Sequence, residues 1–402
     1  MAKQISVGLA GLGGYSNFFL SALLDNMPGN VQFAGAISRN PQRCARLEDL
    51  NKRGVKLFTS LEEFYNDLTV DLMIIPSPIQ YHVPHTCVAL ENGSHVLCEK
   101  PVCGLVQEIE TMKNARETAG KLVAIGYQWS FSRAIQALKK DVLAGVFGAP
   151  RVFKSFVLWP RPDKYYHRNN WAGKLQDPSG NWVLDSPVHN ATAHFLHNSL
   201  YVLGDRTDRS AVPESIEIEA FRAYPIENYD TGVVRCITDT GVTVLHYASH
   251  ATKERIEPIF EFRFENAVVS FADGKQEIIA RFSDGSTRAY GSPMDDPHEK
   301  IRQTIDAVLN DKPTLCGIEA ATPLTLCVNG GQESITEIAD FPPDIIEKKP
   351  ENDTFFLAVK GLKEMLDGCY KAGVMPSERG YALARKADPV SLVGYSSYPQ
   401  IR

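Results

Sequence analysis

The first third of the chain alternates short apolar runs with longer amphipathic stretches. The apolar runs occupy residues 5–10, 31–38, 70–75, 94–98 and 121–127. Each run is short enough to be a buried strand, whereas the intervening stretches have the spacing of helices. Strands that alternate with helices predict a parallel sheet with helices on both faces. We therefore predict an α/β fold that begins with a doubly wound domain over residues 1–130.

The pattern changes after residue 132. Residues 214–282 contain several alternating runs separated by short turns, which predict an antiparallel sheet. Helical periodicity is found at residues 132–144, 187–203, 298–310, 317–334 and 354–372. We predict an α+β domain with an open, mainly antiparallel sheet over residues 131–345. A C-terminal extension over residues 346–402 is expected to pack on the domains or on a neighbouring subunit.

Composition narrows the possible functions. The 402 residues carry 42 basic and 48 acidic side chains, a net charge of −6, which argues against a nucleic-acid partner. No apolar run approaches the roughly 18 residues of a membrane helix, and the N-terminus lacks the pattern of a signal peptide. The eight cysteines are scattered without a Cys-x-x-Cys pair, so we expect a cytoplasmic protein with free thiols and no metal site.

A glycine-rich turn follows the first predicted strand. Gly11, Gly13 and Gly14 precede Tyr15 and Ser16, where a helix is expected to begin. The first glycine permits a tight turn, the second lets the backbone approach a pyrophosphate, and the helix N-terminus attracts negative charge. The third position of the usual pattern is Ser16 instead of glycine or alanine. After a first strand, this turn predicts a dinucleotide site, with a merely tight turn as the alternative.

The end of the second strand selects between cofactors. An NAD site would place a carboxylate there for the ribose 2′-hydroxyl. This chain has Ser38 and Arg39, with Arg43 one helical turn further on. A hydroxyl and two guanidinium groups suit a 2′-phosphate. The residues favour NADP as the cofactor, while NAD and a purely solvated pair of arginines stay open.

Two further positions have the chemistry of hydride transfer. Lys100 follows the strand expected at residues 94–98, at the sheet edge where α/β folds bind ligands, and could stabilise charge on a substrate oxygen. Asp185 and His189 are four residues apart at a predicted helix start, so their side chains lie near one face. Such a pair suits general acid–base catalysis. The alternatives are a capped surface turn at Lys100 and a structural helix cap at Asp185.

Four motifs, in their order and spacing, resemble the Gfo/Idh/MocA family of oxidoreductases. They are Gly11–Gly14, Pro78–His82, Glu99–Pro101 and the pair Asp185 and His189. The resemblance implies an N-terminal Rossmann domain that binds the dinucleotide. It also implies a C-terminal domain whose sheet carries substrate and subunit contacts, as in a homodimer or homotetramer.

The resemblance also implies residue roles. His189 would be the acid/base, Asp185 would orient it, and Lys100 would polarise the substrate oxygen and position the nicotinamide ribose. The positions that it adds to the cofactor site are Ser77, His82, Glu99 and Gln128, beside Lys100 itself. The chain departs from the family pattern at Ile79, Ser130 and Pro187, which leaves the substrate class open.

Substrate contacts are expected in an aromatic loop before Asp185. Residues 159–171 combine Trp, Tyr, Arg, His and Asn, residue types that stack on sugar rings and bond their hydroxyls. His167 and Trp171 are the candidates there, together with Lys100, Asp185 and His189. Aromatic residues that only anchor the loop are the alternative.

The sequence thus favours an NAD(P)-dependent enzyme that moves a hydride between the nicotinamide and a carbohydrate alcohol or ketone, such as a sugar or polyol. Two alternatives stay open. One is a glycosidase that uses bound nicotinamide for transient oxidation and elimination, and the other is a non-catalytic regulator that senses a dinucleotide or a sugar. The expected partners are a small carbohydrate and other copies of the chain, without nucleic acid or membrane.

Overall fold

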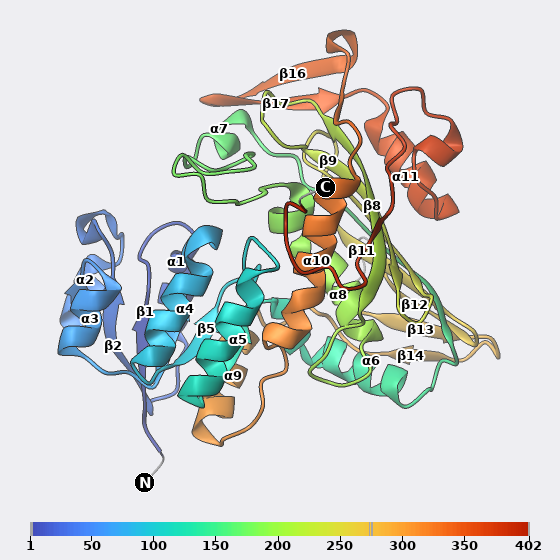
Figure 1. The fold of residues 1–402 in the computed structure, drawn as a ribbon. Helices are drawn as coiled ribbons and strands as arrows, with labels where there is room; N and C mark the ends of the chain where they lie inside the picture. The colour runs from blue at the N-terminus through green and yellow to red at the C-terminus, as the bar shows by residue number, and fades with distance from the viewer. Residues whose placement is uncertain (1–2, 273, 275, 401–402) are drawn as a thin grey trace. The chain divides into compact units, whose positions relative to one another are not determined.

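The computed structural model describes residues 3–272, 274 and 276–400. Their contacts divide the chain into two units. The first unit comprises residues 3–103, 107–132 and 296–321, and the second comprises the remaining described residues. Each unit contains a large sheet of its own (Figure 1).

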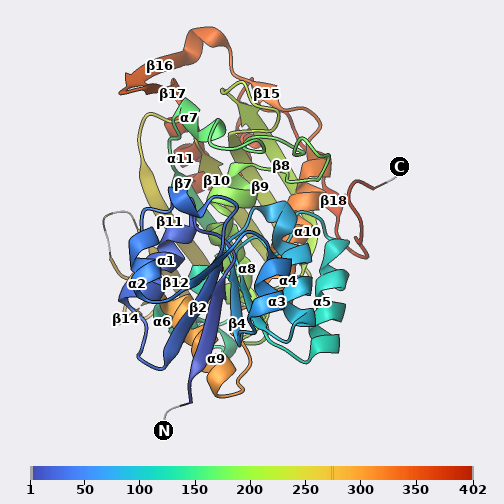
Figure 2. The ribbon, with the colours of Figure 1, turned by 90° about the vertical axis from the view of Figure 1, so that its left-hand side faces the viewer.

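The first unit is a six-stranded sheet with helices on both faces. Its strands are β1 (Ile5–Leu9), β2 (Val31–Ile37), β3 (Lys56–Phe58), β4 (Leu72–Ile75), β5 (His95–Cys98) and β6 (Val123–Ile125). Its main helices are α1 (Ser16–Asp25), α2 (Leu47–Lys52), α3 (Leu61–Asp67), α4 (His82–Glu91) and α5 (Glu108–Ala119). The strand order is β3-β2-β1-β4-β5-β6, and every neighbouring pair is parallel. In Figure 2, α3, α4 and α5 lie on one side of these strands and α1 and α2 on the other, which confirms the doubly wound prediction.

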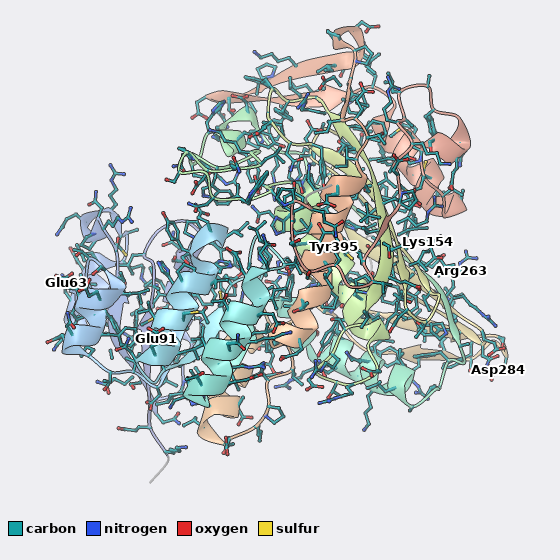
Figure 3. The ribbon with its side chains drawn as sticks, viewed as in Figure 1. Glu63, Glu91, Lys154, Arg263, Asp284 and Tyr395 are labelled. Atoms are coloured by element: carbon teal, nitrogen blue, oxygen red, sulfur yellow. The ribbon has the colours of Figure 1, made fainter. Side chains whose placement is uncertain are left out.

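Local sequence explains the ends of these elements. All four residues of β4 are buried, as a central strand covered on both faces requires. At the start of α3, the Ser60 hydroxyl accepts a hydrogen bond from the Glu63 N–H at 3.1 Å, and the Glu63 carboxylate accepts one from the Thr59 N–H at 2.8 Å. These reciprocal bonds form a capping box. Glu63 is labelled on α3 in Figure 3.

Residues 296–321 return to the first unit, although the sequence placed them in the second domain. They contain α9 (Glu299–Leu309), which packs against β5 and the 3₁₀ turn Gln128–Phe131. The Gln303 side chain donates to the Phe131 carbonyl at 3.0 Å, and the Ile125 N–H donates to the Cys316 carbonyl at 2.8 Å. The chain thus extends the β6 edge with a segment nearly 200 residues away, which periodicity along the sequence cannot indicate.

The second unit contains a ten-stranded, mainly antiparallel sheet, as predicted. Its strands are β7 (Pro150–Leu158), β8 (Pro213–Arg222), β9 (Thr231–Thr238), β10 (Thr243–Ser249), β11 (Ile256–Phe264), β12 (Ala267–Phe271), β13 (Ile279–Phe282), β14 (Thr287–Ala289), β15 (Ala339–Asp340) and β18 (Val390–Ser391). The order is β14-β13-β12-β11-β7-β10-β9-β8-β15, and β18 pairs with β8. The exceptions to antiparallel pairing are β7 with β10 and β8 with β15.

The helices of this unit are α6 (Arg133–Leu143), α7 (Asp163–Tyr166), α8 (Ala193–Leu203), the second part of α10 (Ile318–Ser334) and α11 (Leu362–Ala372). Of these, α8 and α11 contact β7 and β10 in the middle of the sheet, α10 packs on β8, α6 packs on α8, and α7 contacts β17. Alternate residues of β10 face different partners, since side chains alternate along a strand. Leu245 and Tyr247 belong to the apolar cluster that includes Leu366 of α11, whereas His246 bonds to Thr192, just before α8.

The C-terminal extension packs on the second unit itself. The prediction of one helix over residues 354–372 is wrong for its first part, because residues 354–359 form β17 (Thr354–Val359), paired with β16 (Ile346–Glu351). The aromatic and β-branched residues of β17 favour a strand, and α11 begins only after Gly361, whose φ is +75°. Lys154 of β7, labelled in Figure 3, donates to the Tyr370 carbonyl of α11 at 3.0 Å.

Within the described residues, no helix has both the length and the apolar character needed to cross a bilayer.

Candidate functional site

The first unit contains a pocket of about 570 Å³ at the carboxyl ends of its strands. Loops after β1, β2, β3 and β4 line it, so it lies where doubly wound sheets bind ligands. The predicted cofactor residues that line this pocket are Gly11, Gly13, Ser16, Ser38, Arg39, Arg43 and Ser77. The structure therefore brings together residues from three separate segments that the sequence had assigned to one site.

The glycine-rich turn has the backbone that a phosphate cradle needs. Gly11 has a φ of +152° and Gly14 a φ of +59°, and residues other than glycine rarely adopt these backbone conformations. A Cβ on Gly13 would meet no atom within 4 Å, so the space beside Gly13 is open. The first turn of α1 contains no acidic residue that would compete with a bound anion.

The pocket wall carries two cations and no carboxylate. Within the described part of the chain, neither Arg39 nor Arg43 pairs with an acidic side chain. Their neighbour Arg46 is different, because its two terminal guanidinium nitrogens donate to the two carboxylate oxygens of Asp25, each at 2.8 Å. The lack of an acidic residue at the end of β2 matches a 2′-phosphate better than a free ribose 2′-hydroxyl.

Six of the predicted cofactor residues lie outside this wall, namely Gly14, Tyr15, His82, Glu99, Lys100 and Gln128. Tyr15 is 49% exposed beside the turn, and Gln128 begins the 3₁₀ turn after β6. The two ring nitrogens of His82 contact the carbonyl oxygens of Pro101 at 2.6 Å and Ser77 at 2.8 Å. His82 thus ties the end of β4 to the segment after β5.

Glu99 and Lys100 follow β5 and adjoin a buried ion pair. The Lys100 N–H donates to Glu99 Oε2 at 3.1 Å, and Glu99 Oε1 accepts a hydrogen bond from Lys300 Nζ. Lys300 comes from α9 and also lies 3.3 Å from the Tyr15 hydroxyl. Burial alone would lower the pKa of Lys300, but Glu99 and Tyr15 raise it overall, so the ammonium stays charged. The ion pair connects the glycine-rich turn to the segment that carries Lys100.

Sequence reasoning missed several residues of this wall. Tyr81 and His85 both line the pocket, and their rings stack with centroids 5.4 Å apart. Burial, followed by the charges of His82 and Arg39, lowers the pKa of His85 to about 4, so this ring is neutral near pH 7. Tyr81 ends the 3₁₀ turn Ile79–Tyr81 and His85 lies in the first turn of α4, so their spacing of four across the helix start was the signal that could have identified them.

In the second unit, Asp185 is held by its surroundings. It is 3% exposed, and its two carboxylate oxygens accept hydrogen bonds from the Gly173 N–H at 2.6 Å and the Asn190 side chain at 2.7 Å. Arg168 approaches the carboxylate at 4.0 Å. The preceding residue, Leu184, has a φ of +46°, a rare conformation for a bulky residue that is concentrated at functional sites.

His189 lies on a π-helical turn (Pro187–Ala191) that leads into α8. It is fully buried, and its Nδ1 lies 3.0 Å from the Val183 carbonyl and 3.2 Å from the Leu184 carbonyl. Carbonyl oxygens only accept, so Nδ1 carries the proton and, in the neutral ring, Nε2 holds the lone pair. The Ser186 hydroxyl caps the turn by accepting from the His189 N–H at 3.2 Å. The expected role of Asp185 in orienting His189 stays a prediction.

The aromatic loop places its two predicted substrate residues differently. The His167 side chain is 73% exposed and lies 3.3 Å from Asp163. Trp171 is half-buried, and its ring centroid lies 5.3 Å from the guanidinium carbon of Arg168. Arg168 contacts both the Trp171 ring and the Asp185 carboxylate, so Trp171 lies near the proposed catalytic residue. The His167 ring is exposed and contacts Asp163, so the structure supports a substrate contact less well for His167 than for Trp171.

Comparison with known proteins supports the family resemblance. Residues 5–127 match the family model described as "Oxidoreductase family, NAD-binding Rossmann fold". Residues 5–127 are therefore similar to the Gfo/Idh/MocA family of oxidoreductases. The match covers the first unit from β1 to the end of β6, including the glycine-rich turn, and it confirms the resemblance seen in the motifs.

Several curated relatives are named as enzymes of sugars or inositols. The chain is 30% identical over 147 residues to 1,5-anhydro-D-fructose reductase of Ensifer adhaerens, which covers 36% of this chain and 42% of the relative. It is 27% identical over 189 residues to a scyllo-inositol 2-dehydrogenase (NADP⁺) of Bacillus subtilis, which covers 46% and 51%. The chain therefore spans about half the length of the curated relatives that it matches.

Solved structures extend the likeness to both units. The WlbA dehydrogenase from Bordetella pertussis, in complex with NADH and UDP-GlcNAcA, aligns with a TM-score of 0.69 at 20% identity, over 83% of this chain and 96% of the other. An oxidoreductase from Agrobacterium radiobacter, in complex with NAD⁺, L-tartaric acid and magnesium, aligns with a TM-score of 0.68 at 15% identity, with the same coverage. At these identities the comparison establishes the fold alone.

The residues that line the pocket suit a bound dinucleotide. The open space at Gly13 leaves room for a pyrophosphate, and two unpaired guanidinium groups can receive a phosphate. Among the described residues, no group of three or more His, Cys, Asp or Glu side chains is arranged to hold a metal ion.

Proposed function

We propose that the chain is an NAD(P)-dependent oxidoreductase that acts on CH–OH groups of carbohydrates, with NADP favoured over NAD. The observation that carries this is the pocket of the first unit, where the glycine-rich turn meets Arg39 and Arg43 with no acidic residue in the wall. The relatives named as a reductase of 1,5-anhydro-D-fructose and an NADP⁺-dependent scyllo-inositol dehydrogenase support the substrate class.

The dinucleotide would contact residues that follow the carboxyl ends of the strands in the first unit. The turn residues Gly11, Gly13, Gly14, Tyr15 and Ser16 would hold the pyrophosphate, and Ser38, Arg39 and Arg43 the 2′-phosphate. The further residues proposed around the cofactor are Ser77, His82, Glu99, Lys100 and Gln128. When bound, the dinucleotide supplies the acceptor or donor of the hydride.

Three residues would form the catalytic group. His189 would take the hydroxyl proton at Nε2 during alcohol oxidation and return it during ketone reduction, because its Nδ1 is committed to carbonyl oxygens. Lys100 would donate a hydrogen bond to the substrate oxygen and stabilise its developing charge. Asp185 would orient His189 and contact the substrate, beside Trp171 and His167.

The second unit would serve substrate binding and assembly. Its open sheet is proposed to carry the subunit contacts of a homodimer or homotetramer in the cytoplasm. Native mass spectrometry of the purified full-length protein would report the subunit count.

The same experiment tests the cofactor. We expect the wild-type chain to retain NADP or to bind added NADP⁺, and Gly13→Val to lose about 100-fold of this affinity because a side chain would fill the pyrophosphate space. Gly29→Val is the matched control, since its Cβ would also meet no atom within 4 Å. Equal nucleotide binding by Gly13→Val would contradict the proposed site.

Turnover tests the catalytic group. With a panel of sugars and polyols, reduced nicotinamide should accumulate, and His189→Ala and Lys100→Met should each lower kcat by at least about 100-fold. Lys52→Met removes an exposed ammonium elsewhere in the first unit and should leave kcat unchanged. Unchanged rates in both site variants would reject the assigned roles. Cleavage of glycosides without net accumulation of reduced nicotinamide would indicate redox-assisted hydrolysis instead.

A further inference from the structure

The second unit contains a cluster of cations that the proposed reaction does not use. Arg161 lies between β7 and α7, and Arg168 follows α7, which packs beside β17 in Figures 1 and 2. Both guanidinium groups face the Tyr165 ring, with their carbons 4.9 and 3.7 Å from its centroid. Aromatic faces hold a guanidinium in place and leave its N–H groups available for a ligand.

Arg161 lacks an anionic partner. Among the described residues, no acceptor lies within hydrogen-bond reach of its buried Nε, and no carboxylate pairs with its guanidinium. Its other neighbours are also cationic or aromatic, because Trp159 stacks at 5.5 Å and the charges of Arg255 and Arg168 act on it. Burial and these two charges lower its pKa. Holding like charges together costs free energy that a bound anion would offset.

A buried histidine adds a second unmet group. His250 is 2% exposed, its Nδ1 lies 3.1 Å from the Tyr166 hydroxyl, and its Nε2 has no hydrogen-bond partner among the described residues. The backbone N–H of Arg161 donates to the backbone carbonyl of His250 at 3.1 Å, so the two residues are neighbours. When Tyr166 donates to Nδ1, Nε2 carries the proton and becomes another donor beside Arg161.

The cluster borders the proposed catalytic pair. Arg168 is 4.0 Å from the Asp185 carboxylate, and Tyr165 is close enough to Asp185 for its charge to raise the pKa of the tyrosine, after burial. The Arg168–Asp185 distance is at the limit of an ion pair, and no carboxylate among the described residues pairs with Arg161. The cationic cluster thus adjoins the proposed catalytic Asp185 through Arg168.

We propose that Arg161, Arg168 and His250 form a subsite for an anionic group of the substrate, so that the enzyme acts on acidic carbohydrates. The group is a carboxylate or a phosphate ester, since the planar guanidinium fork binds both. This inference rests on the proposed function, which it narrows from carbohydrates in general to sugar acids or sugar phosphates. Arg161 provides the main charge, and the Arg168 guanidinium, which also contacts the Asp185 carboxylate, screens the bound anion from that carboxylate.

Binding measured by calorimetry tests the subsite without turnover. The full-length protein with saturating NADP⁺ is titrated with D-glucuronate, D-glucose 6-phosphate and D-glucose. We expect at least one of the two anions to bind about tenfold or more tightly than D-glucose. Tighter binding of D-glucuronate would indicate a carboxylate site, and tighter binding of D-glucose 6-phosphate would indicate a phosphate site.

Variants separate the subsite from general electrostatics. Arg161→Leu should lose about tenfold of the affinity for the preferred anion and keep its affinity for D-glucose, whereas Arg161→Lys should lose less. Arg255→Leu is the charge-matched control, because Glu257 already pairs with that guanidinium. The proposal is overturned by equal binding of anions and D-glucose, by an unchanged anion affinity in Arg161→Leu, or by an equal loss in Arg255→Leu.

Repeating the titrations without NADP⁺, together with a turnover assay, distinguishes failure of the anionic subsite from failure of the proposed function. Anion-selective binding in a protein that neither holds a nucleotide nor turns over sugars would reject the proposed function and keep the subsite. Turnover of neutral sugars alone, with intact nucleotide binding, would reject the subsite and keep the proposed function.

Discussion

The two units hold their internal polar groups in different ways. In the first unit, a full ion pair lies behind the glycine-rich turn, where the buried Lys300 contacts Glu99. In the second unit, His246 bridges Ser155 at 2.8 Å and Thr192 at 3.0 Å as a neutral ring. At these two places the first unit relies on a pair of charges and the second on a neutral ring, although the second unit also holds an ion pair between the buried Lys154 and Glu261.

The units agree in how they treat charges at their proposed ligand sites. Arg39 and Arg161 have no carboxylate partner among the described residues, although Arg46 and Arg235 nearby are paired with acidic side chains. The pairing state alone does not mark a ligand site, since Arg53 and Arg281 also lack a carboxylate partner among the described residues. Arg39 and Arg161 are distinguished by their surroundings, because Arg39 lines the pocket and Arg161 lies among aromatic rings and other cations.

Breaking the ion pair of the first unit should have the largest effect. Lys300→Met leaves the Glu99 carboxylate buried without its partner, which typically costs about 3–5 kcal/mol of the free energy of unfolding. Urea unfolding followed by circular dichroism would measure the loss. Because Tyr15 and Lys100 both adjoin this pair, nucleotide affinity should also fall.

Two controls make this test specific. The double variant Lys300→Met/Glu99→Gln removes both charges and should recover part of the loss. Lys312→Met breaks an exposed pair with Asp306 and should cost less than about 1 kcal/mol. A Lys300→Met protein as stable as the wild type would show that the pair contributes nothing, and the contrast between the units would fail.

The buried, neutral ring of His246 in the second unit predicts a dependence of stability on pH. Burial lowers the pKa of His246 to about 3, against 6.5 in the unfolded chain. Between these values only the unfolded state binds the proton, so stability falls as the pH falls below about 6.5. At about pH 5 this one histidine accounts for about 2 kcal/mol.

Variants of His246 sharpen the comparison. His246→Asn lowers the stability at every pH, but it should reduce the loss between about pH 7.5 and pH 5 by about 2 kcal/mol. His167→Asn replaces a histidine whose side chain is 73% exposed and should leave the loss unchanged. The same pH dependence in His246→Asn and the wild type would mean that His246 is not held neutral.

The sequence predicted what is local and missed what is distant. The glycine-rich turn, the capping box at Ser60 and the doubly wound sheet follow from neighbouring residues, and the structure has all three. The partnership of Lys300 with Glu99 joins residues 201 positions apart, and the environment of Arg161 depends on His250. Strand β17 was missed because its apolar residues, taken with the following helix, fit a helical period. Pairing with β16 decided the outcome.

Removing an uncompensated arginine from the first unit should have the smallest effect of the three. Arg39→Ala takes away one of two cations at the proposed 2′-phosphate, so the affinity for NADP⁺ should fall about tenfold while that for NAD⁺ changes little. Arg53→Ala removes a nearby exposed guanidinium and should change neither affinity, as fluorescence titration would show. Equal losses for NADP⁺ and NAD⁺ would assign Arg39 to the shared part of the nucleotide, and the missing carboxylate partner would then no longer mark the 2′-phosphate.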